Sequence, residues 1–252
     1  MNFPATTIDE VLHQLDQIIE NTIQENSRLG FFAYLYRRVT AQVKQAILEN
    51  QFEDNARMFL MDVAFANLYL DAFNKFTKGE PISESWKIAF EAKNEKLTII
   101  QHLILGMNAH INLDLGVAAA SVAPGEKIIS LKNDFMKVNQ ILNDLTNEMQ
   151  NRVARVSRLM ILLDWIGKNS DEVIINFSIV KAREQAWNLA SVLAYLPEKE
   201  KILLINETDN TISMLAALLK RPPLHIVHYI LRIISFFEDK SVKTIITKLE
   251  ES

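Results

Sequence analysis

The sequence of 252 residues contains no cysteine, which excludes a disulfide scaffold, a zinc site with thiolate ligands and a cysteine nucleophile. Glycine and proline number only six each, so the chain lacks the turn formers that all-β folds place at every hairpin. Positive charge is not in excess either, and a net charge of -4 is not the profile of a nucleic-acid-binding protein. We see neither a signal peptide nor a run of roughly 18 uncharged apolar residues, and therefore expect no transmembrane segment and a cytoplasmic location.

Apolar side chains are plentiful, at 49% of the residues, and they recur at helical spacing almost from end to end. This pattern predicts an all-α fold. We expect a single compact multi-helix bundle of roughly nine to eleven helices around a buried central helix. One domain over residues 1–252 is expected, with the N-terminal helix and a C-terminal helix from about residue 241 at its periphery.

Capping residues and breakers predict where the helices begin and end. Thr7 and Glu10 have the spacing of a capping box, which starts a first helix. Gly79 followed by Pro81 ends a third helix, and Ser83 is expected to cap the next one. The other helices are expected over about 29–51, 97–120, 134–156 (after an irregular stretch over 124–133), 159–166, 170–196, 198–219 and 224–237.

The central helix carries polar residues into the expected core. His110 and Asp114 are one turn apart on an apolar stripe, where they can ligate one metal ion or hydrogen-bond each other. Gly106 lies on the same stripe, which predicts close approach of another helix or of a ligand. Asn108 and Asn112 lie on the opposite side, as expected of residues that orient their neighbours.

Other polar residues also fall on inward faces. Asp62 lies on the apolar stripe of the third helix and is expected to be buried and partnered. Arg183 lies on a stripe with Trp187 and needs a carboxylate, for which Asp62 and Asp114 are the expected partners. The remaining side chains expected to line a pocket are Tyr36, Thr40 and His102.

Several of these residues belong to a recognisable motif. Residues 106–115 read Gly-x-Asn-Ala-His-Ile-Asn-x-Asp-Leu, and this segment resembles an uncharacterised bacterial family, domain of unknown function 5995. The resemblance implies an all-helical fold and no known activity. Looser matches to that family span about residues 39–190: Val39-Thr40, Phe52-Glu53-Asp54, Asp62, Phe65-Ala66-Asn67, Tyr69-Leu70, Gln101-His102-Leu103, Ala182-Arg183 and Ala186-Trp187.

The motif is more remotely similar to helical zinc phospholipases C and single-strand nucleases. Those enzymes hold zinc with His-x-x-x-Asp pairs on buried helices, and His110 with Asp114 looks like one such pair. A second His-x-x-x-Asp pair has no counterpart in this sequence. The likeness therefore implies one metal ion at most.

Two functional interpretations stay open. In the first, the chain is a hydrolase of an ester or phosphoester, with Asp62, His110 and Asp114 as acid–base groups or as ligands of one divalent ion (zinc, manganese or iron). Arg183 then binds the anionic part of a small-molecule substrate. In the second, the chain is a non-catalytic ligand-binding or interaction protein, and the same residues form a structural network. A terpene-cyclase-like pocket ranks last, since an Asp-Asp-rich motif is lacking.

Overall fold

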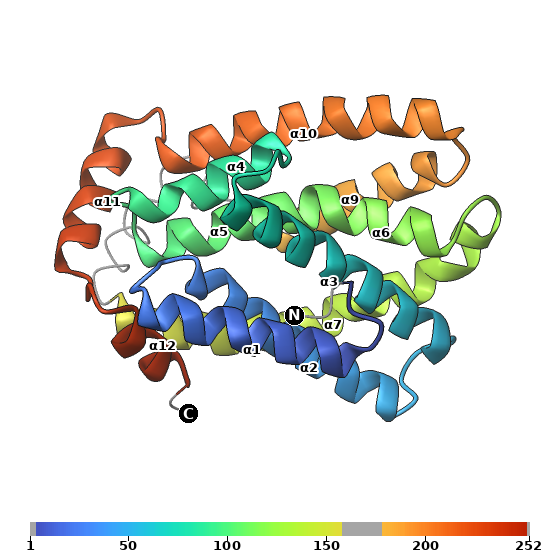
Figure 1. Cartoon of the computed structure of the whole chain (residues 1–252), viewed down its shortest axis with the longest axis horizontal. Coiled ribbons are helices and arrows are strands. Elements are labelled where there is room, and N and C mark those ends of the chain that lie inside the picture. Colours follow the sequence, from blue (N-terminus) through green and yellow to red (C-terminus); the bar gives the residue numbers. More distant parts are fainter. Residues whose placement is uncertain (1–3, 158–177, 251–252) are drawn as a thin grey trace.

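The computed structural model describes residues 4–157 and 178–250, and every regular element in those ranges is a helix (Figure 1). The predicted all-α class is therefore confirmed. The elements are α1 (Ile8–Gln24), α2 (Gly30–Leu48), α3 (Asn55–Lys78), α4 (Glu84–Glu91), η1 (Ala92–Asn94), α5 (Ile99–Ala109), η2 (His110–Asp114), α6 (Leu115–Val122), α7 (Lys127–Val156), α9 (Ile179–Leu193), α10 (Glu198–Lys220), α11 (His225–Phe237) and α12 (Val242–Glu250).

Most predicted helix ends are confirmed. Thr7 and Glu10 form the capping box of α1, and Gly79 ends α3 in the left-handed region with φ 72°. The irregular stretch predicted over 124–133 is wrong. A turn at Gly125, whose N–H donates to the Ala194 carbonyl at 2.7 Å, lets α7 begin at Lys127. The helix predicted over 159–166 and the start predicted near residue 170 lie outside the described residues.

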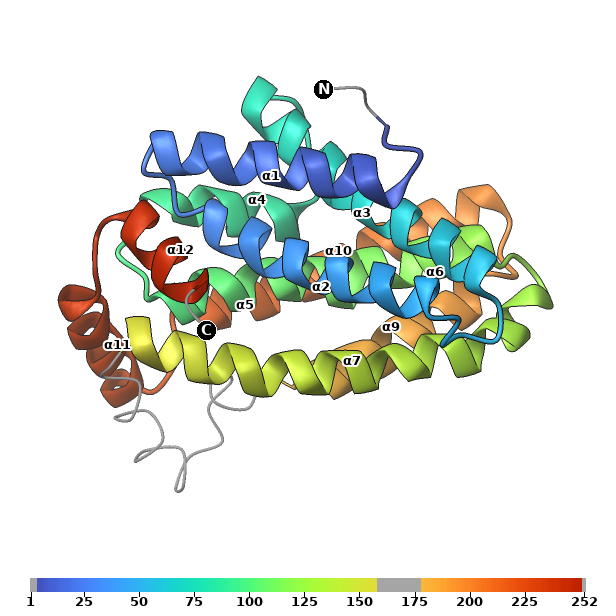
Figure 2. The same cartoon turned by 90° about the horizontal axis from the view of Figure 1, so that it is seen from below.

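The predicted central helix is present as α5, η2 and α6 in succession. It crosses the middle of the molecule, with α2, α3 and α4 packed against one part of its circumference and α9 and α10 against another (Figures 1 and 2). Two buried apolar clusters surround it, one centred on α1, α2, α4 and α5, the other on α6, α7 and α9. The polar residues of the central helix therefore lie where α2, α3, α4, α9 and α10 meet it.

The N-terminus of α4 is capped by a residue of another helix, α10. Ser83 was expected to cap this helix, but its side chain makes no capping hydrogen bond. The carboxylate of Asp209 on α10 accepts the backbone N–H groups of Glu84 at 2.7 Å and Ser85 at 3.0 Å instead. An acid at a helix N-terminus satisfies free N–H groups and complements the helix dipole. The cap thus joins α4 to α10.

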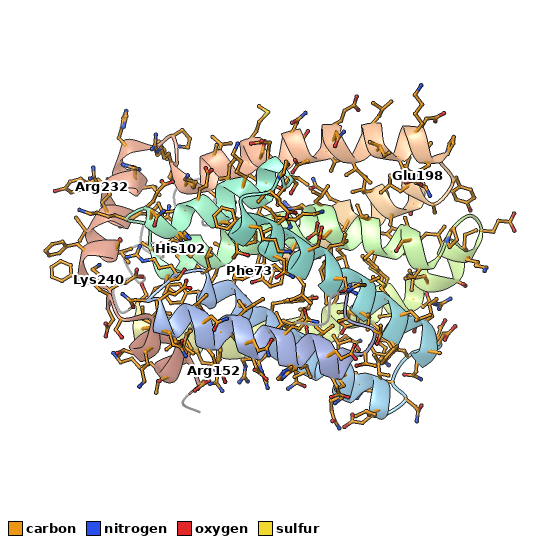
Figure 3. The ribbon with its side chains drawn as sticks, viewed as in Figure 1. Phe73, His102, Arg152, Glu198, Arg232 and Lys240 are labelled. Atoms are coloured by element: carbon orange, nitrogen blue, oxygen red, sulfur yellow. The ribbon has the colours of Figure 1, made fainter. Side chains whose placement is uncertain are left out.

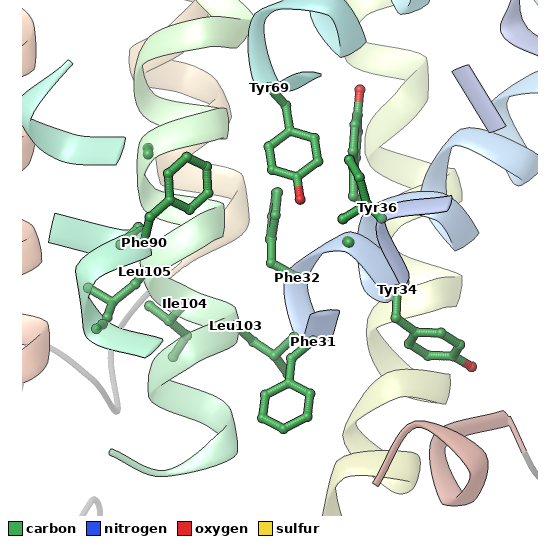
Figure 4. Packing of buried hydrophobic residues seen from close by; sticks show 14 of the residues in the cluster. Phe31, Phe32, Tyr34, Tyr36, Tyr69, Phe90, Leu103, Ile104 and Leu105 are labelled. Atoms are coloured by element: carbon green, nitrogen blue, oxygen red, sulfur yellow. The ribbon is translucent and has the colours of Figure 1, made fainter. Parts of the chain in front are cut away.

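Gly106 marks the close approach of α2 to α5. A Cβ atom at this position would lie 2.4–2.9 Å from three atoms of Phe32, closer than carbon atoms pack in proteins. Phe32 itself is buried and lies near Tyr36 and Tyr69 (Figure 4). The Trp86 ring also contacts it, so the Phe32 ring has little room to move. The expectation that another helix approaches Gly106 is confirmed.

We therefore expect Gly106→Ala to lower the free energy of unfolding by about 3 kcal/mol, the upper end of overpacking costs. Urea denaturation followed by circular dichroism measures this loss. The matched control is the same change in a Phe32→Ala background, which lacks the two closest atoms, Phe32 Cγ and Cδ2, so Gly106→Ala should cost less stability there. A single variant as stable as the wild-type chain would contradict the prediction.

Two described segments are long and apolar enough to cross a membrane by length and composition. The first, Ile99–Val122, is 83% buried inside the fold over its most apolar window, as a core helix is. The second, Glu198–Lys220, is only 22% buried over that window. The absence of a transmembrane segment stays a prediction.

Candidate functional site

The central helix changes its winding at the motif. Residues His110–Asp114 form a π-helical turn between α5 and α6. Such turns insert one extra residue into an α-helix and are frequent at functional sites. Four of the five residues in this turn are buried, among them His110 and Asp114. The π turn therefore projects an acid and an imidazole into the interior.

His110 and Asp114 form the predicted pair. His110 Nδ1 lies 3.0 Å from Asp114 Oδ2, and the same oxygen accepts the indole N–H of Trp86 at 2.9 Å. Since indole nitrogen only donates, we assign Asp114 as the acceptor of both bonds and place the imidazole proton on Nδ1. His110 Nε2 is then left with a free lone pair. This is the geometry in which a carboxylate orients a histidine base.

An aromatic box surrounds His110. The Phe65 ring stacks on the imidazole with centroids 3.7 Å apart and planes 7° from parallel, and Tyr36 approaches edge-on at 4.4 Å. Phe32, Tyr69 and Trp86 complete the box at 5.7–6.0 Å. Burial in this box lowers the pKa of His110, against the opposing effect of the Asp114 hydrogen bond, and burial raises the pKa of Asp114.

Polar atoms without a hydrogen-bond partner gather around this box. They come from α2, α3 and the π turn, and each is fully buried. An unpaired buried polar atom costs on the order of 1–3 kcal/mol, so a cluster of them needs an explanation. Within the described residues the cluster comprises Asp62 Oδ2, Tyr69 Oη and His110 Nε2, together with the hydroxyl groups of Tyr36 and Thr40, which lie close enough to interact with each other.

Asp62 is the acid of this cluster. It was expected to be buried and partnered: the burial is confirmed, but Oδ2 has no partner among the described residues. Burial raises the pKa of Asp62 from 3.8 to about 7, so about half of the Asp62 carboxyl groups are protonated at neutral pH. Burial also raises the pKa of Tyr36, which the charge of Asp62 raises further, and that of Tyr69. Tyr36, Tyr69 and the protonated form of Asp62 are therefore neutral hydrogen-bond donors.

His102 lies in a different place from His110. It contacts Phe31 and accepts the Arg28 Nη1–H at 3.3 Å, in a small recess that Glu238 and Lys240 also line. Figure 3 shows His102 and Lys240 in the same part of the molecule. Burial and the charges of Arg28 and Lys220 lower the pKa of His102 to about 3. The structure thus separates His102 from the pocket in which the sequence placed it.

Arg183 was predicted to pair with Asp62 or Asp114, and this prediction is wrong. Its guanidinium donates to Asn139 Oδ1 and to the Phe135 carbonyl, both on α7, and lies over the Phe135 ring at 4.5 Å. Burial lowers the pKa of Arg183 to about 9. Backbone and amide oxygens replace the expected carboxylate because α7 extends along α9 at this point.

Trp187 contacts the same residue of α7 as Arg183, namely Phe135. Its ring packs against Phe135 with centroids 5.0 Å apart, in the apolar cluster of α6, α7 and α9. It is not among the rings around His110. Trp187 therefore packs α9 against α7.

Asn108 and Asn112 face α10. Asn112 Nδ2 donates to Asn108 Oδ1 at 3.1 Å, and Asn108 Nδ2 donates to the Ile212 carbonyl at 3.1 Å. These bonds join the central helix to the α10 backbone, and the role of the two asparagines in a site stays a prediction. Neither of these two hydrogen bonds involves His110 or Asp114.

The donor set was tested against a divalent metal. Among the residues that the structure describes, no three His, Asp or Glu side chains converge as an ion would need. His110 Nδ1 and Asp114 Oδ2 bond to each other, which leaves His110 Nε2 and Asp62 Oδ2 as unpartnered nitrogen and carboxylate atoms near the box. The ion stays a prediction.

Three contributors to the site were missed from the sequence. Trp86, on a separate short helix, fixes Asp114, and nothing in its local sequence signals that contact. Phe65 and Tyr69 lie on the same stripe of α3 as Asp62, three and seven residues further on. That spacing could have placed them beside the acid, but an apolar stripe by itself indicates only core packing.

The chain was compared with protein families, curated proteins and solved structures. Neither a curated protein nor a solved structure matches the chain. One family does, described as a family of unknown function, and the match runs over residues 8–222. That span contains the π turn, its aromatic box and every residue of the unpartnered cluster. The chain therefore belongs to the family of unknown function DUF5995.

Proposed function

We propose that this protein hydrolyses a small neutral ester and that His110 acts as the general base. The observation that supports the proposal is the chain of hydrogen bonds from Trp86 through Asp114 to His110, which ends on an unpartnered Nε2. A base held in one tautomer by a carboxylate can take a proton from a water molecule or a hydroxyl group. The lowered pKa of His110 keeps Nε2 unprotonated at neutral pH.

Neutral donors on the other side of the box support the same chemistry. Attack on an ester carbonyl places negative charge on its oxygen, which buried hydrogen-bond donors stabilise. Tyr36, Tyr69 and the protonated form of Asp62 are such donors, since burial raises the pKa of each. A protonated carboxylic acid in an apolar site is an effective donor of this kind. Thr40 adds a further hydroxyl group next to Tyr36.

The charge of the site favours a carboxylic ester over a phosphoester. The cation expected to bind a phosphate, Arg183, is engaged by α7 instead. The ionisable groups that remain around the box are acids and one histidine: Asp62, Asp114 and His110. Aromatic walls suit an uncharged substrate. We therefore assign the substrate to the class of small neutral esters.

The test is hydrolysis of p-nitrophenyl acetate by the full chain, measured as release of p-nitrophenolate. His110→Gln is expected to lower the rate by about a hundredfold, the loss typical of removing a general base. His102→Gln is the matched control, because that histidine is also buried on the central helix but lies in a separate recess. Equal rates for the wild-type chain and a folded His110→Gln variant would contradict the proposal.

The structural network stays the second candidate, and one observation favours it: only 2% of His110 is exposed, so a substrate reaches it only when neighbouring side chains move. Tyr69→Phe distinguishes the two. Its hydroxyl has no described partner, so a structural role predicts unchanged or higher stability and unchanged hydrolysis, whereas the proposed role predicts slower hydrolysis. Metal analysis of the purified protein tests the predicted ion separately.

A further inference from the structure

The helix α11 has two apolar faces. One face packs into the core through Val227, Leu231 and Ile234. The other carries large hydrophobic side chains that stay exposed, among them Phe236 at 75% and Phe237 at 69%. Both views of the fold place α11 at one end of the molecule (Figures 1 and 2). The exposed set, here called the α11 stripe, comprises Leu224, Ile226, Tyr229, Phe236 and Phe237.

The stripe is continuous along the helix. At about 100° per residue, its helical members and the half-buried Ile230 and Ile233 fall within an arc of about 120°. A contiguous exposed face of this kind marks an interaction surface. Leu60 on α3 and Ile129 on α7, in contrast, are single exposed hydrophobic residues.

The charges around the stripe are positive. Arg221 and Arg232 are exposed and have no ion-pair partner among the described residues (Figure 3 shows Arg232 at the surface). His225 lies on the same face of the helix as Arg232, two turns earlier. Residues 221–237 contain no acid at all, although the whole chain has a net charge of -4. The stripe therefore sits in a cationic region of an acidic protein.

The acids that follow α11 do not neutralise this region. Glu238 is buried and accepts the Ile99 N–H at 2.9 Å and the Ser157 hydroxyl at 2.5 Å. Asp239 accepts the Ser241 N–H at 3.0 Å. Both carboxylates are thus occupied within the fold.

We infer that the α11 stripe inserts into the surface of a membrane that contains anionic lipids. Apolar and aromatic side chains flanked by arginine are what binds a helix in the plane of such a surface. Helix α11 is too short to span a membrane, because its 13 residues are about 20 Å long and the hydrocarbon core of a bilayer is about 30 Å thick. The family match ends at residue 222, so this helix follows the part of the chain that the family shares.

A second copy of the chain suits the stripe less well. A two-fold contact through it would bring Arg232 and its symmetry mate to the same interface without a described acid between them. Like charges at an interface oppose association. Anionic headgroups supply the missing negative charge.

The test is co-sedimentation of the full chain with vesicles of phosphatidylcholine, with and without phosphatidylglycerol. Binding is expected only to the anionic vesicles and should weaken as salt is added. The double variant Phe236→Ser with Phe237→Ser should bind at least about tenfold more weakly, since both rings are exposed and their loss removes the inserted area. Ile129→Ser, a change of a residue that is 68% exposed on α7, is the matched control and should bind normally.

Three results would overturn the inference. The first is absence of binding to either vesicle, and the second is equal binding to both. The third is a dimer, seen by sedimentation equilibrium without lipid, that the double phenylalanine variant dissociates. Arg232→Glu separates charge from insertion, because it should weaken binding to anionic vesicles while both rings remain.

Discussion

Asp114→Ala is expected to lower the free energy of unfolding by about 3–5 kcal/mol, as for other buried pairs that lose one partner. The change removes the acceptor of both the Trp86 indole and the His110 imidazole, and both donors stay buried without a partner. It also opens a cavity beside the π turn. Urea denaturation of the full chain measures the loss.

Asp71→Ala is the matched control for this change. Asp71 lies on the surface side of α3 and pairs with Lys75 at 2.6 Å, one turn away. An exposed pair of this kind contributes less than about 1 kcal/mol. An Asp114→Ala variant no less stable than Asp71→Ala would show that the Trp86–Asp114–His110 chain does not hold the core together.

Raising the pH from about 5 to about 8 is expected to cost the wild-type chain about 3 kcal/mol of stability through Asp62 alone. Burial raises the pKa of Asp62 in the folded state from 3.8 to about 7, so the folded chain binds this proton more tightly than the unfolded chain. The stabilisation is complete below the unfolded pKa and is lost as the pH rises through the folded pKa. Unfolding free energies at several pH values measure it.

Asp62→Asn isolates this contribution, since an amide does not titrate. The difference in stability between Asp62→Asn and the wild-type chain should grow in favour of the variant between these pH values. Asp71→Asn provides the control on the same helix, at a half-exposed acid that is already ion-paired. If the difference in unfolding free energy between Asp62→Asn and the wild-type chain stays constant across this pH range, the pKa of Asp62 is not raised by folding.

The sequence predicted the fold well because its signals are local. Capping residues and breakers determine the ends of α1 and α3, and these were correct. The start of α7 was wrong because the turn at Gly125 is held by the carbonyl of Ala194, which is distant in sequence. The cap of α4 was wrong for the same reason, since Asp209 supplies it. Helix ends that depend on another element are not encoded in their own residues.

The site was predicted only in part. The pair of His110 and Asp114 follows from a spacing of four on one helix, and it is present. Arg183 was assigned to the wrong partner because a helical wheel shows which side chains point inward but not which helix lies opposite. Trp86 could not be assigned to Asp114 for the same reason.

The π turn also changes how the two glycines of the central helix relate to each other. In an uninterrupted α-helix, two residues ten positions apart point in directions about 80° apart. The π turn adds one residue without adding its rotation, so the angle between the two directions becomes about 180°. Gly106 abuts Phe32 of α2, and Gly116 abuts Ala186 and Leu189 of α9. The inserted residue thus places the two glycines on opposite sides of the central helix. Helices α2 and α9 can therefore each approach it closely, one from each side.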